Sequence, residues 1–380
     1  MPPLRPLLPL FLLLHGVLVI ASSSAVAEDV WLNQRVYLKV DARPKVGSRT
    51  LDWNDVTMPA KITKVDGDWL WVGSAWVRRG EVVKQTDGTT YYTRVIRENP
   101  RHAGALLLRG VTFHLKRDYA NAIKDFTEVI RIEPTAHSAY CARASSHYAL
   151  QNFEKSLADL TEAIRLAPEV AVYYNDRGCS YRGRDNYQKS TEEFDEAIRL
   201  DPNLSIAYSN RGVNWLFLKD YDRAMVDFDK AIKIDARNSF AYDGRGYVWS
   251  KRGHYNQALK DWDDSIRAAP EEPGGYYNKA RLYATCMSVG HRDGQMAVES
   301  ARNACELNHW EEWRYVSVLA AAYAELGKFD EAVQWQKKAI AMNKDPEPAD
   351  VADLNARLAL YESDMPFRDP EVSEQANGTE

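Results

Sequence analysis

The residues of this sequence with the best-known chemistry are its cysteines and histidines. The 380-residue chain has four cysteines, separated by 38, 107 and 19 residues (Cys141, Cys179, Cys286 and Cys305). Neither these spacings nor any pair among its eight histidines matches a metal-binding or redox motif. Each cysteine falls in a segment with helical periodicity, where a thiol usually packs as a small apolar group. We therefore expect four free, buried thiols, with pairing as the alternative in an oxidising compartment.

Catalytic motifs are the second place to look for chemistry. Residues 28–380 contain no phosphate-binding loop, no zinc-protease motif, no nucleophile elbow of serine hydrolases and no C-x-x-C pair. The sequence therefore predicts a protein that is not an enzyme and that has no cofactor and no metal. An enzyme or accessory subunit with an unfamiliar site remains the alternative.

Composition and charge narrow the class of protein further. Apolar residues make up 45% of the chain, and 49 Lys and Arg face 54 Asp and Glu, for a net charge of -5. This composition is typical of a globular protein and not of a disordered one. Without a basic stripe the chain lacks the charge that neutralises phosphates, so we expect no nucleic acid partner.

Residues 1–27 have the pattern of a secretory signal peptide. Arg5 is their only charge, the apolar run Leu7 to Ile20 follows, and Ala25-Val26-Ala27 forms a small-x-small cleavage site. The run is shorter than the roughly 20 residues that span a bilayer. We therefore expect an exported, periplasmic or extracellular protein that starts at Glu28. An uncleaved signal anchor is the one membrane attachment that the sequence leaves open.

The segments that must position any site recur with a period of 34 residues. One row of this period consists of small residues, a second of tyrosines and a third of large apolar residues, and a proline recurs near the end of most units. The rows are Gly110, Ala144, Gly178, Gly212 and Gly246; Tyr140, Tyr174, Tyr208 and Tyr242; Phe126, Leu160, Phe194, Phe228 and Trp262; and Pro134, Pro168, Pro202 and Pro270.

Each unit reads as two antiparallel helices. In residues 205–238, Gly212 lies on one face of a first helix and Ala224 on the inner face of a second. Both are small because the helices approach closely there, and Phe228 fills the space beside them. A single pair cannot bury its apolar face alone, so we expect the units to stack.

This pattern of small, aromatic and proline positions resembles the tetratricopeptide repeat. The resemblance implies a mainly α fold: a right-handed α-solenoid of about seven helical hairpins over residues 103–346. Its units start at residues 103, 137, 171, 205, 239, 273 and 313. In the sixth unit the second helix begins late, and in the seventh Gln336 replaces the large apolar residue.

The two ends of the array are expected to be capped. Residues 85–102 read as a linker with the second helix of a half unit, and residues 347–367 as a capping helix. Residues 368–380 are polar and acidic, and we predict a disordered tail there.

Residues 28–84 carry the signs of short strands and not of helices. The stretch from Asp66 to Val77, with Trp69, Trp71 and Trp76, resembles the hairpin of bacterial SH3-like modules. The resemblance implies a small all-β barrel. The tryptophans could form an aromatic groove for an extended ligand or fill the core of so small a barrel, and the sequence leaves both open.

Tetratricopeptide arrays usually bind their ligands on the concave surface formed by the first helices. Carried onto this sequence, the positions that commonly bind give ten candidate residues. They are Asn175, Asp176, Arg182, Asn210, Phe217, Asp243, Tyr247, Tyr277, Asn278 and Arg281. The mixture of polar, aromatic and oppositely charged side chains favours a protein or peptide ligand. The arrangement of a chaperone-binding carboxylate clamp is not met, since Leu107, Val111 and Cys141 occupy places where it needs polar residues.

The leading hypothesis is therefore a non-catalytic protein-interaction scaffold of the cell envelope that binds a partner in its concave groove. In the alternative, the SH3-like module targets the protein to a wall polymer or an envelope protein while the repeats recruit a second partner. The sequence does not predict an oligomeric state.

Overall fold

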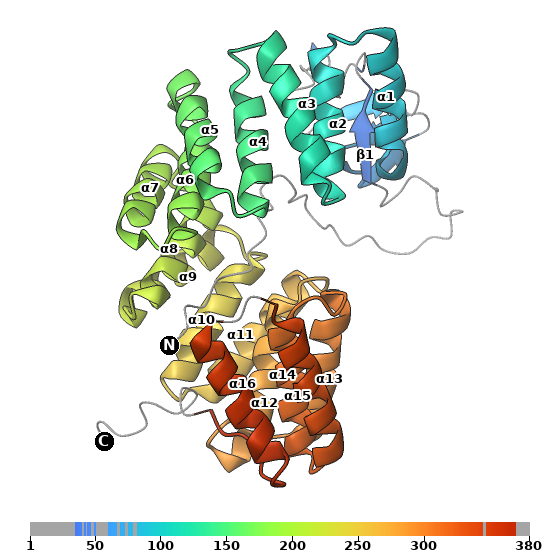
Figure 1. The fold of residues 1–380 in the computed structure, drawn as a ribbon. Coiled ribbons are helices and arrows are strands. Elements are labelled where there is room, and N and C mark those ends of the chain that lie inside the picture. Colours follow the sequence, from blue (N-terminus) through green and yellow to red (C-terminus); the bar gives the residue numbers. More distant parts are fainter. Residues whose placement is uncertain are drawn as a thin grey trace. The chain divides into compact units, whose positions relative to one another are not determined.

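The structure is a computed structural model of the chain, and its secondary structure is mainly helical (Figure 1). It describes residues 35–39, 42, 44–46, 49–50, 60–66, 69–72, 75–78, 82–344 and 347–369. The predicted signal peptide lies outside these residues. Contacts divide the chain after Arg184 into two compact parts, called here the amino-terminal and carboxyl-terminal parts, and each is described by itself.

Each repeat consists of a first helix followed by a second helix. The first helices are α2 (Ala103–Leu115), α4 (His137–Ala149), α6 (Ala171–Arg182), α8 (Ser205–Phe217), α10 (Ser239–Lys251), α12 (Gly274–Thr285) and α14 (Trp313–Glu325). The second helices are α3 (Tyr119–Ile132), α5 (Phe153–Leu166), α7 (Tyr187–Leu200), α9 (Tyr221–Ile234), α11 (Tyr255–Ala268), α13 (Gly294–Leu307) and α15 (Phe329–Met342). Helix α1 (Gly88–Glu98) precedes them and α16 (Pro348–Tyr361) follows.

The glycine row explains how the two helices of a unit fit together. A Cβ atom added at Gly212 of α8 would lie 2.7 Å from the Phe228 ring of α9, and one at Gly246 of α10 would lie 2.6 Å from the Trp262 indole of α11. Both distances are shorter than any real Cβ contact. Because only a hydrogen atom fits, the large apolar side chain of the second helix can lie against the backbone of the first.

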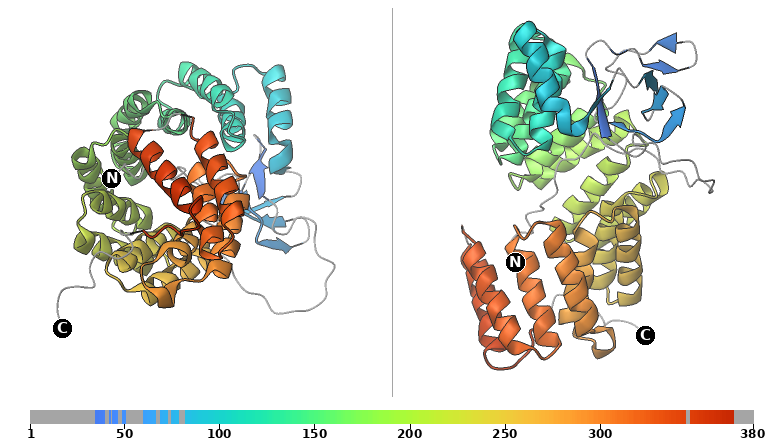
Figure 2. Two further views of the ribbon diagram at one scale, coloured as in Figure 1. Left: turned by 60° about the horizontal axis from the view of Figure 1, so that its bottom comes forward. Right: turned by 90° about the vertical axis from the view of Figure 1, so that its right-hand side faces the viewer.

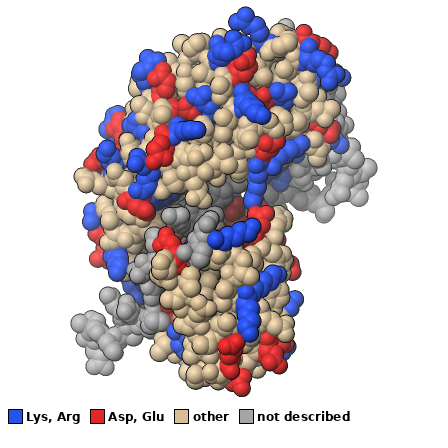
Figure 3. Space-filling view, viewed as in Figure 1, with Lys and Arg blue, Asp and Glu red and all other residues tan. Residues whose placement is uncertain are grey.

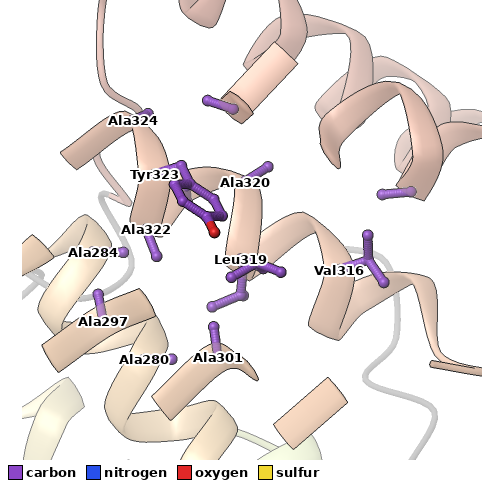
Figure 4. Close-up of a cluster of buried hydrophobic side chains, with 14 of the residues drawn as sticks. Ala280, Ala284, Ala297, Ala301, Val316, Leu319, Ala320, Ala322, Tyr323 and Ala324 are labelled. Carbon is purple, nitrogen blue, oxygen red and sulfur yellow. The ribbon is translucent and has the colours of Figure 1, made fainter. Parts of the chain in front are cut away.

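The carboxyl-terminal part consists of α7 to α16, of which α12 to α16 stand side by side (Figure 1). Many of the buried residues between α12, α13 and α14 are alanines (Figure 4). Because these side chains are small, the helices can approach closely. The cluster includes Ala280, Ala284, Ala297, Ala301, Leu319 and Tyr323.

Gln336 of α15 takes the place of the large apolar residue in the seventh unit, as the sequence indicates. Its side chain is fully buried. It accepts a hydrogen bond from Ser317 of α14 at 2.9 Å and donates to the carbonyl of Leu354 in α16 at 2.8 Å. The amide therefore ties the last unit to the helix that covers it.

The amino-terminal part contains short antiparallel strands beside α1 and α2 (Figure 2). They form two sheets, with strand orders β4-β1-β8 and β3-β2-β7-β6-β5. The strands are β1 (Arg35–Leu38), β2 (Lys45–Val46), β3 (Arg49–Thr50), β4 (Ala60–Lys61), β5 (Lys64–Asp66), β6 (Trp69–Trp71), β7 (Trp76–Arg78) and β8 (Val82–Lys84). The likeness to an SH3 module itself remains a prediction.

The strands and the first helices share one core. Tyr92 of α1 is fully buried among Val36, Leu38 and Leu70, and its hydroxyl donates to the carbonyl of Leu38 at 2.8 Å. Residues of α2 join the same cluster. The β module is therefore packed into the start of the helical array.

All four cysteines are unpaired, and three of them are buried, whereas Cys141 is partly exposed. Among the residues that the structure describes, no helix has the length and apolar character needed to cross a membrane.

Candidate functional site

The carboxyl-terminal part brings three predicted binding residues to one hollow. In it α10 packs against α12, and α12 packs against α14. Tyr247 of α10 and Asn278 and Arg281 of α12 line a small pocket together with Ser250, Trp262 and Leu282. A phenol, an amide and a guanidinium of two first helices thus line the same small hollow.

Arg281 already has a ligand, which the chain itself supplies. Its Nε and Nη2 donate to Oδ2 of Asp369 at 2.9 and 2.5 Å. The backbone NH of Asp369 donates to the carbonyl of Thr285 at 3.0 Å, which holds the segment along the end of α12. Residue 368 was predicted to begin a disordered tail. The structure describes Arg368 and Asp369, and each forms an ion pair with a first helix. Residues 370–380 lie outside the described part of the chain, so the tail itself stays a prediction.

Arg368 binds the neighbouring first helix. Its guanidinium forms an ion pair with Glu325 of α14 at 2.6 Å and a hydrogen bond to the carbonyl of Ala284 at 3.3 Å. Glu325 also receives a hydrogen bond from Arg292 at 3.1 Å. Sequence reasoning missed Glu325, although counting from Trp313 places it at a groove position of the seventh unit.

Asp243 lies at the other side of this surface, near the start of α12. A Cβ atom at Gly274 would lie 2.5 Å from its Oδ2. Its Oδ1 is shielded from solvent and has no hydrogen-bond partner. Burial raises the pKa of Asp243 to about 7, a hydrogen bond from Ser265 opposes the rise, and the charge of Glu272 adds to it. Near neutral pH this carboxyl therefore changes charge easily.

Tyr277 extends the aromatic part of the surface. Its ring lies 4.9 Å from that of Tyr315 in α14, tilted by 41°. With Tyr247 and Arg281 nearby, the surface combines rings and a cation, which suits an acidic or aromatic extended ligand.

The two predicted residues of α8 do not join the pocket. Asn210 is only 6% exposed. Phe217 is half-buried and stacks on Tyr187, with ring centroids 5.0 Å apart. Each therefore contributes first to packing inside the repeat.

The three predicted residues of α6 are buried in the amino-terminal part. Asn175 donates to Asp176 Oδ1 at 3.1 Å, and the Cys141 thiol donates to Oδ2 at 3.6 Å. Burial raises the pKa of Asp176 to about 7, against the effect of both hydrogen bonds. Arg182, with its guanidinium 3.7 Å from the Cys179 sulfur, is 3% exposed. Since α4 and α5 both pack against α6, its polar side chains are enclosed and are not presented to a ligand.

The tryptophans of the β module lie at its surface and do not fill its core. Leu70, Val72 and Val77 are buried, whereas the neighbouring Trp69, Trp71 and Trp76 are partly buried and lie outside the core cluster. Trp71 and Trp76 lie opposite each other in the register of β6 and β7, with ring centroids 5.3 Å apart. Lys45 and Arg78 lie 5.7 and 5.3 Å from the Trp69 ring. Of the two alternatives left open, the structure favours the aromatic face, because none of the three tryptophans belongs to the core cluster.

Charges of both signs are interspersed over the face seen in Figure 3, and no basic stripe runs across it. In the described part of the chain, no three His, Cys, Asp or Glu side chains are arranged to hold a metal ion.

Comparison with known proteins agrees with this architecture. Models of the tetratricopeptide repeat match residues 86–137, 137–170, 171–204, 207–238 and 316–345. The chain therefore contains tetratricopeptide repeats and has the solenoid-like fold of such proteins. No curated protein matches its sequence.

Solved structures similar to the chain are repeat proteins of low sequence identity. A chain of the APC/C hetero-tetramer Cut9-Hcn1 has a TM-score of 0.55 and 16% identity, over 72% of this chain and 52% of that one. Yeast Tom70 has a TM-score of 0.54 and 14% identity, over 73% and 59%. A tetratricopeptide repeat protein from Parabacteroides merdae has a TM-score of 0.47 and 17% identity, over 68% and 98%. At this identity the likeness concerns the fold alone.

Proposed function

We propose that the protein is a non-catalytic scaffold of the cell envelope, which binds a protein or peptide partner on the surface formed by α10, α12 and α14. The observation that carries the proposal is the pocket of Tyr247, Asn278 and Arg281, whose guanidinium binds a carboxylate on an extended segment. An extended peptide with an acidic side chain would meet the same partners. The leader-like residues 1–27 support the envelope location.

Crosslinking mass spectrometry on the intact protein in its native cells tests this proposal. A partner should crosslink to residues of the first helices α10, α12 and α14, among which Lys279 of α12 is partly exposed. Crosslinks that gather only on second helices, such as at Lys230 and Lys260, would place the partner on the opposite face.

A second function is favoured by the aromatic face of the β module. Trp69, Trp71 and Trp76, with Lys45 and Arg78 beside them, suit a wall polymer or an extended peptide of an envelope protein. In that case the module would target the protein while the repeats recruit a partner.

Deleting the module is a poor test, because its strands share a core with α1 and α2. Instead, Trp71→Ala together with Trp76→Ala removes two partly buried rings and leaves the core residues Leu70 and Val77 in place. Loss of binding to isolated cell walls, with partner binding by the repeats unchanged, supports targeting. Unchanged wall binding removes this second function.

A further inference from the structure

The segment after α16 folds back onto the first helices. Helix α16 ends at Tyr361, and a turn through Asp364, with a positive φ of 55°, reverses the chain. The backbone NH of Met365 donates to the carbonyl of Leu360 at 2.9 Å and closes the turn. Residues Pro366 to Asp369 then run, without regular secondary structure, to α12.

Three consecutive side chains attach this segment, and each does so differently. Phe367 packs against the core of the last units, with the Arg357 guanidinium 4.1 Å from its ring. Arg368 binds Glu325 of α14, and Asp369 binds Arg281 of α12. The segment thus presents an aromatic side chain, a cation and an anion in sequence.

The places it binds are places where a partner would bind. Arg281 lines the pocket with Tyr247 and Asn278. The carbonyls of Ala284 and Thr285, at the end of α12, accept hydrogen bonds from Arg368 and Asp369. The ion pairs are largely shielded from water, since the side chains of Arg281 and Asp369 are 20% and 8% exposed and that of Glu325 is 14% exposed.

A tethered segment competes strongly with a free ligand. A short linker holds it near its site at an effective concentration of the order of millimolar. A partner that uses Arg281 must therefore displace Asp369, and it does so most easily when it offers the same groups in the same order.

We propose that residues 366–369 compete, from within the chain, with a partner for the surface formed by α10, α12 and α14. The partner peptide is extended and carries an aromatic residue followed by a basic and an acidic one. This inference rests on the proposed function and deepens it. Residues 366–369 then show which chemical groups the ligand carries. Release of this segment controls the partner's access to Arg281.

Binding of the segment in trans tests the proposal. The probe is a fluorescein-labelled peptide of residues 363–370 (SDMPFRDP), and its anisotropy is measured with the full chain. In a release variant, Arg368→Ala with Asp369→Ala, the internal segment loses both ion pairs and leaves the groove open. We expect the release variant to bind the peptide at least tenfold more tightly than the unchanged chain. Adding Arg281→Gln to it should reverse the gain.

Glu362→Gln is the matched control, since it removes a neighbouring carboxylate that is exposed and pairs with Lys337 away from α12. It should bind the peptide as weakly as the unchanged chain. Should the release variant lose helicity, Asp369→Asn alone keeps Arg368 and Phe367 in place and should give a smaller gain in the same direction. Equal binding by the unchanged chain and the release variants, or binding that is insensitive to Arg281→Gln, overturns the proposal.

The partner found by crosslinking separates this inference from the proposed function. A partner that binds the first helices equally well with and without the release substitutions contradicts the competitor but leaves the scaffold in place. A partner that never contacts α10, α12 or α14 contradicts both.

Discussion

Arg245 of α10 binds both carboxylate oxygens of Asp261 in α11. Its Nε donates to Oδ2 at 2.8 Å and its Nη2 to Oδ1 at 2.7 Å. The third nitrogen, Nη1, reaches back to Asp229 of the preceding unit at 2.7 Å. The same bidentate pair recurs at multiples of 34 residues as Arg109 with Asp125, Arg143 with Asp159 and Arg211 with Asp227. One arginine in each of four units thus joins the two helices of its own unit, and Arg211 and Arg245 also join the unit before.

Asp261→Asn should lower the free energy of unfolding by about 1.5 to 3 kcal/mol, because it breaks a bidentate, charge-assisted pair whose carboxylate is only 4% exposed. Asp229→Asn removes a carboxylate from the same guanidinium at a site that is 56% exposed. It should cost about 0 to 1 kcal/mol. Urea unfolding of the two variants measures both values. Equal losses would mean that the pair does not contribute through its burial.

Gly212→Leu should destabilise the carboxyl-terminal part by about 1 to 3 kcal/mol or more, because the new side chain enters the space of the Phe228 ring. Stability in a repeat array sums over neighbouring interfaces, so the loss should spread to the adjacent units. Hydrogen exchange, read helix by helix, would show faster exchange in α8 to α11. Gly290→Ala is the control, since a Cβ there has open space around it. If the Gly212→Leu chain unfolded at the same midpoint as the Gly290→Ala control, the helices would not meet at this glycine.

The stability of the amino-terminal part should depend on pH through Asp176. Burial raises its pKa from 3.8 to about 7, so between these values the folded chain holds a proton that the unfolded chain has lost. Its stabilising contribution is therefore complete below about pH 4 and is lost as the pH rises through 7, by up to about 1.4 kcal/mol per pH unit. The lowered pKa of His114, about 4, acts in the opposite direction, because stability is gained there as the pH rises.

Asp176→Asn isolates this contribution, since His114 is common to both chains. The variant should gain stability relative to the unchanged chain between pH 4.5 and pH 7.5, as measured by urea unfolding at each pH. A constant difference across that range would show that Asp176 is ionised in the folded chain throughout.

The 34-residue repeat pattern was enough to predict the helical fold, because each row of similar residues marks a contact between neighbouring helices. Gly212 and Phe228 lie 16 residues apart and meet inside one hairpin, so their types alone indicate the contact. The arginines Arg109, Arg143, Arg177, Arg211 and Arg245 have the same 34-residue spacing, but this row does not by itself indicate packing, since charged residues on helices are usually assigned to the surface.

The site was harder to predict because exposure depends on distant neighbours. Asp176 and Arg182 have the positions of groove residues but are enclosed by α4 and α5. Asp369 lies 88 residues from Arg281, and no spacing rule connects the two. Only the folded chain shows which arginine of the first helices faces a carboxylate.

The affinity of the crosslinked partner for Arg281→Glu, beside that for Lys155→Glu with Arg165→Glu, tests the central claim most directly. Lys155 and Arg165 lie exposed on the second helix α5, where Arg165 forms an ion pair with the neighbouring Glu162 at 2.6 Å. Reversal at Arg281 should weaken binding at least tenfold, because a charge-assisted contact that is partly shielded is worth about 1.5 to 3 kcal/mol. Reversal on α5 should change it by less than about fivefold, as exposed charges contribute about 0 to 1 kcal/mol. Equal losses in the two variants, with helicity kept in both, or a loss only in the α5 variant, would contradict a partner bound on the first helices.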